Sequence, residues 1–184
     1  QTGTFRVAVA DAVEPVTGQV ASGNYHAVVG IPMTLGRGFQ SEPDRDVSRA
    51  SIVVISDAFW ARAFGRRPDV VGSTITVNGR QAEVVGVTAP GFYGLDSQMR
   101  VDVTLPLSVV GLDRPDFFDD HGTWMGMRLV GRVKPGVTEG QALAAPDIVF
   151  QQFMREPEQQ WVFAGPGRDR FRSAALLPAA WGSD

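Results

Sequence analysis

Hydrophobic and polar positions alternate in several short stretches of this chain, a pattern that predicts short β-strands. Phe5, Val7 and Val9 fall on one face of residues 5–9, which is typical of a half-buried strand. The run Ile-Val-Val-Ile at 52–55 is wholly apolar and β-branched, so we expect a strand covered on both faces. Further strands are expected at residues 74–77, 81–87, 101–105, 127–133 and 171–177.

Capping and turn signals between these strands predict short helices and one tight hairpin. Ser56 is expected to cap a helix with Phe59, Trp60 and Ala63 on one face, and Gly65 to end it. A second short helix is expected at 25–29, with N-cap chemistry in Ser22-Gly23-Asn24 and Gly30 as its left-handed cap. The pair Asn78-Gly79 is typical of a two-residue type I′ turn.

The C-terminal third contains a second capping signal. Residues 134–136 predict a turn, and Thr138 with Gln141 forms a T-x-x-Q capping box, so a helix should begin near Glu139. Pro146 is expected to kink or restart that helix. Its apolar side is expected to continue through Ile148, Val149, Phe153 and Trp161.

Three stretches, residues 14–18, 32–39 and 108–123, contain no pattern that predicts a strand. Glu14-Pro15 and Thr17-Gly18 indicate turns, residues 32–39 are rich in glycine, and residues 108–123 are acidic and irregular. Hairpins dominate over a regular alternation of strands and helices. The predicted fold class is therefore α+β, a mostly antiparallel sheet with short helices.

Composition narrows the classes of function. The 184 residues are 43% hydrophobic and 20% charged, enough for one domain or two small lobes. The net charge of −3 and the scattered arginines argue against binding to nucleic acid or to an acidic membrane surface. The absence of cysteine excludes disulfides, thiolate metal sites and a cysteine nucleophile. No apolar run approaches the roughly 18–20 residues of a membrane span.

Catalytic motifs are missing from the sequence. It contains no G-x-S-x-G, H-E-x-x-H, phosphate-binding G-x-x-x-x-G-K-[ST] or EF-hand pattern. Carboxylates and one imidazole gather in a single segment, at Asp113, Asp116, Asp119, Asp120 and His121. Such groups can hold a divalent cation, but the spacing matches no ligand template and a solvated acidic loop is favoured. We predict no enzyme and no catalytic, cofactor-binding or metal-binding residue.

Other polar groups have structural explanations. Asp44, Arg45, Asp46 and Arg49 indicate a surface loop with local ion pairs of little energetic worth. His26 is expected to be a partly buried structural residue rather than a ligand or proton switch. The Gly-Pro-Gly-Arg sequence at 165–168 lacks the preceding strand and following helix start of a phosphate loop. Phe59 and Trp60 are expected in the core.

Six segments follow one another along the chain with distinctive glycine, proline and apolar positions. They are SGNYHAVVGI with LGRGF (22–31, 35–39), IVVISDAFW with FG (52–60, 64–65), DVVG (69–72), VNG with EVVGVTAPGF (77–79, 83–92), VDVTLP (101–106) and VGRVKPGVT with QA (130–138, 141–142). In this order they resemble the MacB-like periplasmic core domains of ABC-transporter permeases. His26 and Thr104 depart from the family pattern, which usually has phenylalanine and often tryptophan there. Pro146 interrupts its long helix.

The resemblance implies an extracytoplasmic, non-catalytic domain inserted between transmembrane helices. It implies two lobes, a mostly-β inserted lobe at 1–108 and an acidic connection with a partial porter-like βα lobe at 109–184. Implied partners are the transmembrane helices of the same permease and a cognate ABC ATPase, and the candidates beyond these are a second permease copy or a periplasmic adaptor. The domain would couple cytoplasmic ATP hydrolysis to substrate export or force transmission. Two alternatives stay open: a free-standing extracytoplasmic ligand-binding or sensor module, and a hydrolase or metal-dependent enzyme using the acidic cluster.

Overall fold

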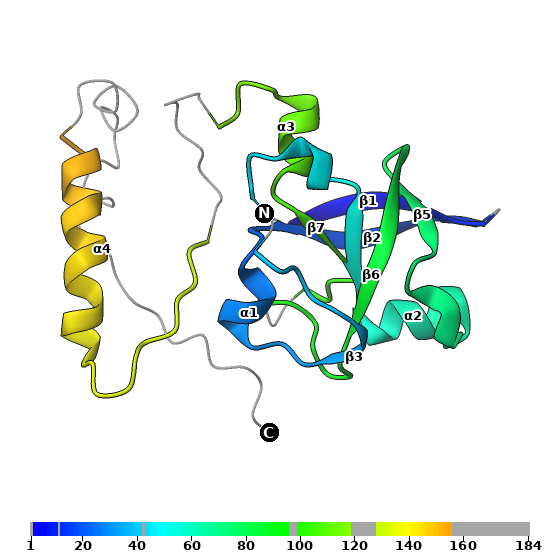
Figure 1. Ribbon diagram of the computed structural model, residues 1–184, viewed down its shortest axis with the longest axis horizontal. Helices are drawn as coiled ribbons and strands as arrows, with labels where there is room; N and C mark the ends of the chain where they lie inside the picture. Colours follow the sequence, from blue (N-terminus) through cyan, green and yellow to red (C-terminus); the bar gives the residue numbers. More distant parts are fainter. Residues whose placement is uncertain (1, 11, 42, 96–98, 119–127, 156–184) are drawn as a thin grey trace. The chain divides into compact units, whose positions relative to one another are not determined.

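The computed structural model describes residues 2–10, 12–41, 43–95, 99–118 and 128–155 (Figure 1). The chain divides into two compact units, represented in the described part by residues 2–118 and by residues 128–155. The first unit contains seven strands, β1 (Thr2–Val9), β2 (Ala12–Ala21), β3 (Met33–Gly36), β4 (Ile52–Ile55), β5 (Thr74–Val77), β6 (Arg80–Thr88) and β7 (Val103–Pro106). Its α-helices are α1 (Tyr25–Val29), α2 (Asp57–Phe64) and α3 (Val109–Asp113), and 3-10 turns lie at Val47–Arg49 and Pro68–Val70.

The seven strands form one sheet that closes on itself. Six of them follow one another in the order β1-β2-β7-β4-β6-β5, and β5 pairs back with β1. β3 pairs with the end of β6 that β5 leaves free. The β2–β7 and β4–β6 pairings are parallel and the other pairings are antiparallel. The α+β class with short helices is confirmed, and the sheet is mixed, with five antiparallel and two parallel pairings among the described strands. The division into lobes at 1–108 and 109–184 stays a prediction.

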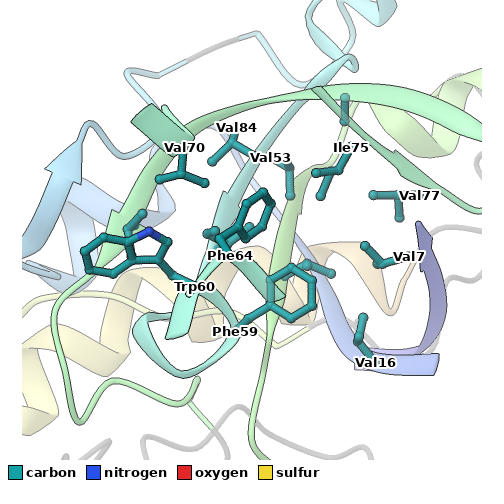
Figure 2. Packing of buried hydrophobic residues seen from close by; sticks show 14 of the residues in the cluster. Val7, Val16, Val53, Phe59, Trp60, Phe64, Val70, Ile75, Val77 and Val84 are labelled. Atoms are coloured by element: carbon teal, nitrogen blue, oxygen red, sulfur yellow. The ribbon is translucent and has the colours of Figure 1, made fainter. Parts of the chain in front are cut away.

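The main core lies within the closed sheet and is completed by α2. Phe59, Trp60 and Phe64 of α2 are buried, and Figure 2 shows them among valine and isoleucine side chains of the strands. Ser56 caps the helix, since its Oγ accepts from the amide of Phe59 at 3.1 Å, and Gly65 ends it in the left-handed conformation. The core role predicted for Phe59 and Trp60 is therefore confirmed.

β4 is covered on both faces, as its apolar sequence predicts. Val53 and Ile55 belong to the core inside the sheet, while Val54 packs outside it with Phe39 and Val85. A strand with two buried faces cannot alternate between apolar and polar residues, which accounts for the uninterrupted apolar run.

The prediction of turns over residues 14–18 was wrong, because β2 runs through both turn signals. Pro15 lies opposite Arg6, whose backbone N–H and C=O point to Asn78 on the far side of β1. Arg6 and Pro15 therefore form a pair without mutual hydrogen bonds, and the missing N–H of Pro15 leaves no gap in this ladder. The neighbouring β7 pairs with β2 only from Gly18 onward, so Pro15 lies where that side of the strand is open.

The glycine-rich stretch 32–39 contains β3, a strand that its sequence pattern did not predict. Gly36 has a φ of +63°, and a Cβ there would lie 2.3 Å from the carbonyl oxygen of Val85. Gly86 is equally constrained, because a Cβ would lie 2.1 Å from the carbonyl oxygen of Arg37. These glycines allow the backbones of β3 and β6 to approach closely. The third irregular stretch, 108–123, begins with the short helix α3.

The second unit contains α4 (Glu139–Phe153) in its described part. The predicted capping box is present: the amide of Gln141 donates to Thr138 Oγ1 at 3.3 Å, and the amide of Thr138 donates to Gln141 Oε1 at 2.9 Å. α4 continues through Pro146 instead of restarting there, since proline removes one amide donor while the flanking turns keep theirs. Residues 128–133 form no strand, which corrects the predicted strand at 127–133.

Several predictions lie outside the described residues. These are the start of the strand at 127, the strand at 171–177, the loop at 165–168, and the positions of Asp119, Asp120, His121 and Trp161. In the part of the chain that the structure covers, no helix has the length and hydropathy needed to cross a membrane.

Candidate functional site

A buried polar cluster lies on the outer face of the sheet, beneath α1. The Gln19 amide Nε2 donates to Tyr25 Oη at 3.1 Å and to Thr104 Oγ1 at 3.0 Å. All three side chains are buried, and Gln19 and Thr104 are register partners of β2 and β7. Burial raises the pKa of the Tyr25 phenol, with the Gln19 bond acting weakly in the other direction. The phenol is therefore neutral near pH 7, and the cluster fixes α1 on the sheet.

His26 is buried beside this cluster, more completely than predicted. Its Nδ1 accepts from the amide of Phe39 at 3.2 Å, and its ring meets those of Tyr25 and Phe39 edge-on at centroid distances of 5.2 and 4.6 Å. Gly38 permits the packing, because a Cβ there would lie 2.6 Å from the Cβ of His26. His26 therefore packs as an aromatic ring and joins α1 to the chain after β3.

The charged loop at 41–49 does more than form local ion pairs. The predicted local pair is present between Arg49 and Asp46, at 3.8 Å with both side chains exposed. Asp44 instead accepts from the amide of Gly23 at 2.8 Å, and the Arg45 guanidinium donates to the carbonyl oxygen of Phe118 at 2.6 Å. The loop therefore ties the turn before α1 to the end of the first unit, a long-range role that no local signal in the sequence indicated.

The described members of the acidic cluster, Asp113 and Asp116, do not belong to a group of side chains that could bind a metal ion. Asp113 forms an ion pair with Arg80 at the start of β6, and Asp116 is exposed. Within 2–118 and 128–155, apart from the gaps named above, no three histidine, aspartate or glutamate side chains converge as metal ligands would. The described part of the cluster therefore contributes a surface ion pair.

Arginines on α2 and the turn after it are matched by carboxylates. Arg66 donates to both oxygens of Asp57 at 2.7 and 2.8 Å, and its guanidinium lies over the Trp60 ring at 5.3 Å. Arg67 donates twice to Asp69 at 3.0 Å, and this hydrogen bonding lowers the pKa of the Asp69 carboxyl. Two-pronged guanidinium–carboxylate pairs fix orientation as well as charge.

Arg62 links α2 to β2 and to the residue that precedes β7. It donates to Asp102 Oδ2 at 3.1 Å, immediately before β7, and to the Glu14 carboxylate of β2 at 3.4 Å. Its guanidinium also lies over the ring of Phe59 at 5.3 Å. The hydrogen bonds of Arg62 to Glu14 and Asp102 therefore attach α2 at the protein surface, whereas Phe59 and Trp60 attach the same helix through the core.

These arrangements bind parts of the domain to each other: the guanidiniums of α2 and of the turn after it meet carboxylates, and the buried amide, phenol and hydroxyl meet one another. They belong to an α+β domain built on one closed, mixed sheet. The model of the MacB-like periplasmic core domain matches residues 2–145, and the chain belongs to that family. No curated protein matches the chain.

Two of the solved structures that resemble this chain share its fold. The periplasmic region of MacB from Actinobacillus actinomycetemcomitans has a TM-score of 0.57 and 16% identity, with 90% of this chain and 74% of that chain covered. A domain of a protein described as a permease from Porphyromonas gingivalis has a TM-score of 0.53 and 18% identity, covering 83% and 65%. The extracellular domain of the ABC-type transporter YknZ from Gram-positive bacteria is 17% identical with a TM-score of 0.49. This chain spans about half of it, 54%.

Proposed function

We propose that this chain is the extracytoplasmic, non-catalytic domain of an ABC-transporter permease. In this role it passes movement driven by cytoplasmic ATP hydrolysis to the outside of the membrane, for substrate export or force transmission. The observation that carries the proposal is the family match over residues 2–145. Two of the named structures support it, since they come from MacB and from a protein described as a permease.

The partners in this proposal are those of a membrane-tethered module. They are the transmembrane helices of the same permease, the cognate ATPase acting through them, and a second permease copy or a periplasmic adaptor. The division into a mostly-β inserted lobe at 1–108 and a porter-like lobe at 109–184 belongs to the same proposal.

The construction of the first unit suits the transmission of movement. A domain passes on displacement only if its parts move together, and strands in a closed sheet support each other on both sides. Here Phe59 of α2 is fully buried inside the sheet, and Arg62 of the same helix is bonded to Glu14 and Asp102 outside it. Displacing α2 would therefore disturb both the core and two strands.

The location of the domain is tested by labelling single cysteines in the full-length permease in intact cells. These 184 residues contain no cysteine, so in a permease whose other cysteines are replaced by serine, Val13→Cys places one thiol at a side chain that is 67% exposed. Val53→Cys is the matched control, because Val53 is 0% exposed. A membrane-impermeant maleimide should label Val13→Cys in intact cells and Val53→Cys only after denaturation. Labelling of Val13→Cys only after lysis would contradict an extracytoplasmic location.

A further inference from the structure

The closed sheet is completed by a short seam between β1 and β5. Only two register pairs join these strands, Val7 with Val77 and Ala8 with Thr76. The β1–β2 ladder, by contrast, runs through the full length of β1, from Thr2 to Val9. The β5–β6 hairpin therefore meets β1 over a small part of that strand (Figure 1).

Asn78 extends this seam by one residue through its side chain. The amide of Arg6 donates to Asn78 Oδ1 at 2.8 Å, and the amide of Asn78 donates to the carbonyl oxygen of Arg6 at 2.8 Å. In an ordinary antiparallel pair both acceptors are backbone carbonyls. The chain turns into β6 at Asn78, where φ is +49°, and the side-chain oxygen takes the place of the backbone acceptor.

A second short seam, between β4 and β7, provides a comparison within the same sheet. It also has two register pairs, Val54 with Thr104 and Ile55 with Val103. All four of those side chains are at most 4% exposed, so this seam is covered on both faces.

The β1–β5 seam is covered on one face only. Val7 and Val77 are buried toward the core, whereas Ala8 and Thr76 are half-buried on the outer face and Arg6 is exposed. Water therefore reaches the β1–β5 hydrogen bonds from the outer face. The free energy of local opening is lowest where few buried contacts have to be broken.

We propose that the closed sheet opens first at the β1–β5 seam and that the Asn78 side chain is the latch that holds it shut. Opening separates the β1–β2 hairpin from the β5–β6 hairpin while the β2–β7 and β4–β6 ladders remain paired. The β1–β5 seam is then the part of the sheet that opens most easily, while the other strands stay paired with their neighbours. This inference concerns the fold of residues 2–118 and stands whether or not the transporter role is correct.

Amide hydrogen exchange of the unmodified 184-residue chain under native conditions is the first test. The seam amides of Arg6 and Asn78 should exchange through a lower-energy opening than the amides at the β4–β7 seam. Those are the amide of Val54 in β4 and the amide of Ser56, which directly follows β4 and donates to the carbonyl oxygen of Asp102. Their exchange should also be insensitive to low denaturant, as expected for local opening. Equal protection of the two seams, with equal sensitivity to denaturant, would overturn the proposal.

Two variants test the latch itself. Asn78→Gly keeps the positive φ but removes the acceptor, and should raise Arg6 exchange about two- to ten-fold, the effect of one net hydrogen bond. Asn78→Asp keeps an acceptor oxygen and should stay within about two-fold of the unmodified chain. Exchange at Val54 serves as the internal reference for both. An unchanged Arg6 rate in Asn78→Gly would show that the side chain holds nothing shut.

A reversible crosslink separates opening at this seam from opening elsewhere. Ala8→Cys with Thr76→Cys places thiols on a register pair outside the core. Like Arg6 and Asn78, two residues away, this is a hydrogen-bonded antiparallel pair, with a Cα separation of roughly 5.5 Å that a disulfide can span. Oxidation should slow exchange of the Arg6 amide, while the same variant reduced should match the unmodified chain. Equal Arg6 exchange in the oxidised and reduced forms would place the opening elsewhere and refute the proposal.

Discussion

Replacing Trp60 with alanine tests whether α2 is an integral part of the core. The Trp60 side chain is 7% exposed and packs with the residues inside the closed sheet. Its indole Nε1 donates to the carbonyl oxygen of Arg67 at 2.8 Å, which holds the turn after the helix. Deleting a buried tryptophan removes its transfer free energy and leaves a cavity, at a cost of about 3–5 kcal/mol.

A second substitution separates packing from the hydrogen bond. Trp60→Phe keeps an aromatic ring but removes the N–H donor, which leaves the carbonyl oxygen of Arg67 without this bond. Trp60→Phe should lower the free energy of unfolding by less than Trp60→Ala, by about 1–3 kcal/mol. Val13→Ala is the matched control, because Val13 is 67% exposed and such substitutions usually stay within about 0.5 kcal/mol.

The assay is urea unfolding of the three variants followed by far-ultraviolet circular dichroism, with thermal melts in parallel. Trp60→Ala should lower the melting temperature by roughly 10 °C, since about 1 kcal/mol corresponds to a few degrees in a domain of this size. If Trp60→Ala and Val13→Ala unfolded at the same midpoint, the packing of α2 inside the sheet would be refuted, and a contact role for an exposed Trp60 would follow.

Two further predictions concern the backbone and the charges. Gly86→Ala should destabilise the domain by about 1–3 kcal/mol in urea unfolding, because its Cβ would collide with the carbonyl oxygen of Arg37, and wild-type stability would contradict the close approach of β3 and β6. The Arg67 bonds lower the pKa of Asp69, so the stability that this pair contributes is present above the ordinary aspartate range and is lost as pH falls through the lowered pKa. Asp69→Asn should therefore reduce the acid-side loss of stability in unfolding midpoints measured down to about pH 2, and an identical pH profile would contradict it.

Local signals in the sequence determined the helix ends and the tight turn, because the hydrogen-bond donors and acceptors of these features are only a few residues apart in the chain. Ser56 and Gly65 bound α2, Asn78-Gly79 turns β5 into β6, and the pair Thr138 and Gln141 starts α4. A cap or a two-residue turn satisfies backbone groups with neighbours in the chain, so its residues suffice to predict it. The family resemblance rests on the same kind of residue, and the match over 2–145 confirms it.

The tertiary structure alone decided which turn signals are overridden and where the sheet closes. Pro15 lies within β2 because the fold places its missing N–H where no strand is paired, and β3 forms because Gly36 and Gly86 meet the backbone of the facing strand. The strand expected at 127–133 has an apolar pattern, yet residues 128–133, the part of it that the structure describes, form no strand. A strand needs a partner, and partners far apart in the chain are not encoded in a local pattern. The long-range hydrogen bonds of Asp44 and Asn78 follow the same rule. The sequence predicts a surface loop around Asp44 and a tight turn at Asn78, and only the fold places Gly23 or Arg6 within reach of their side chains.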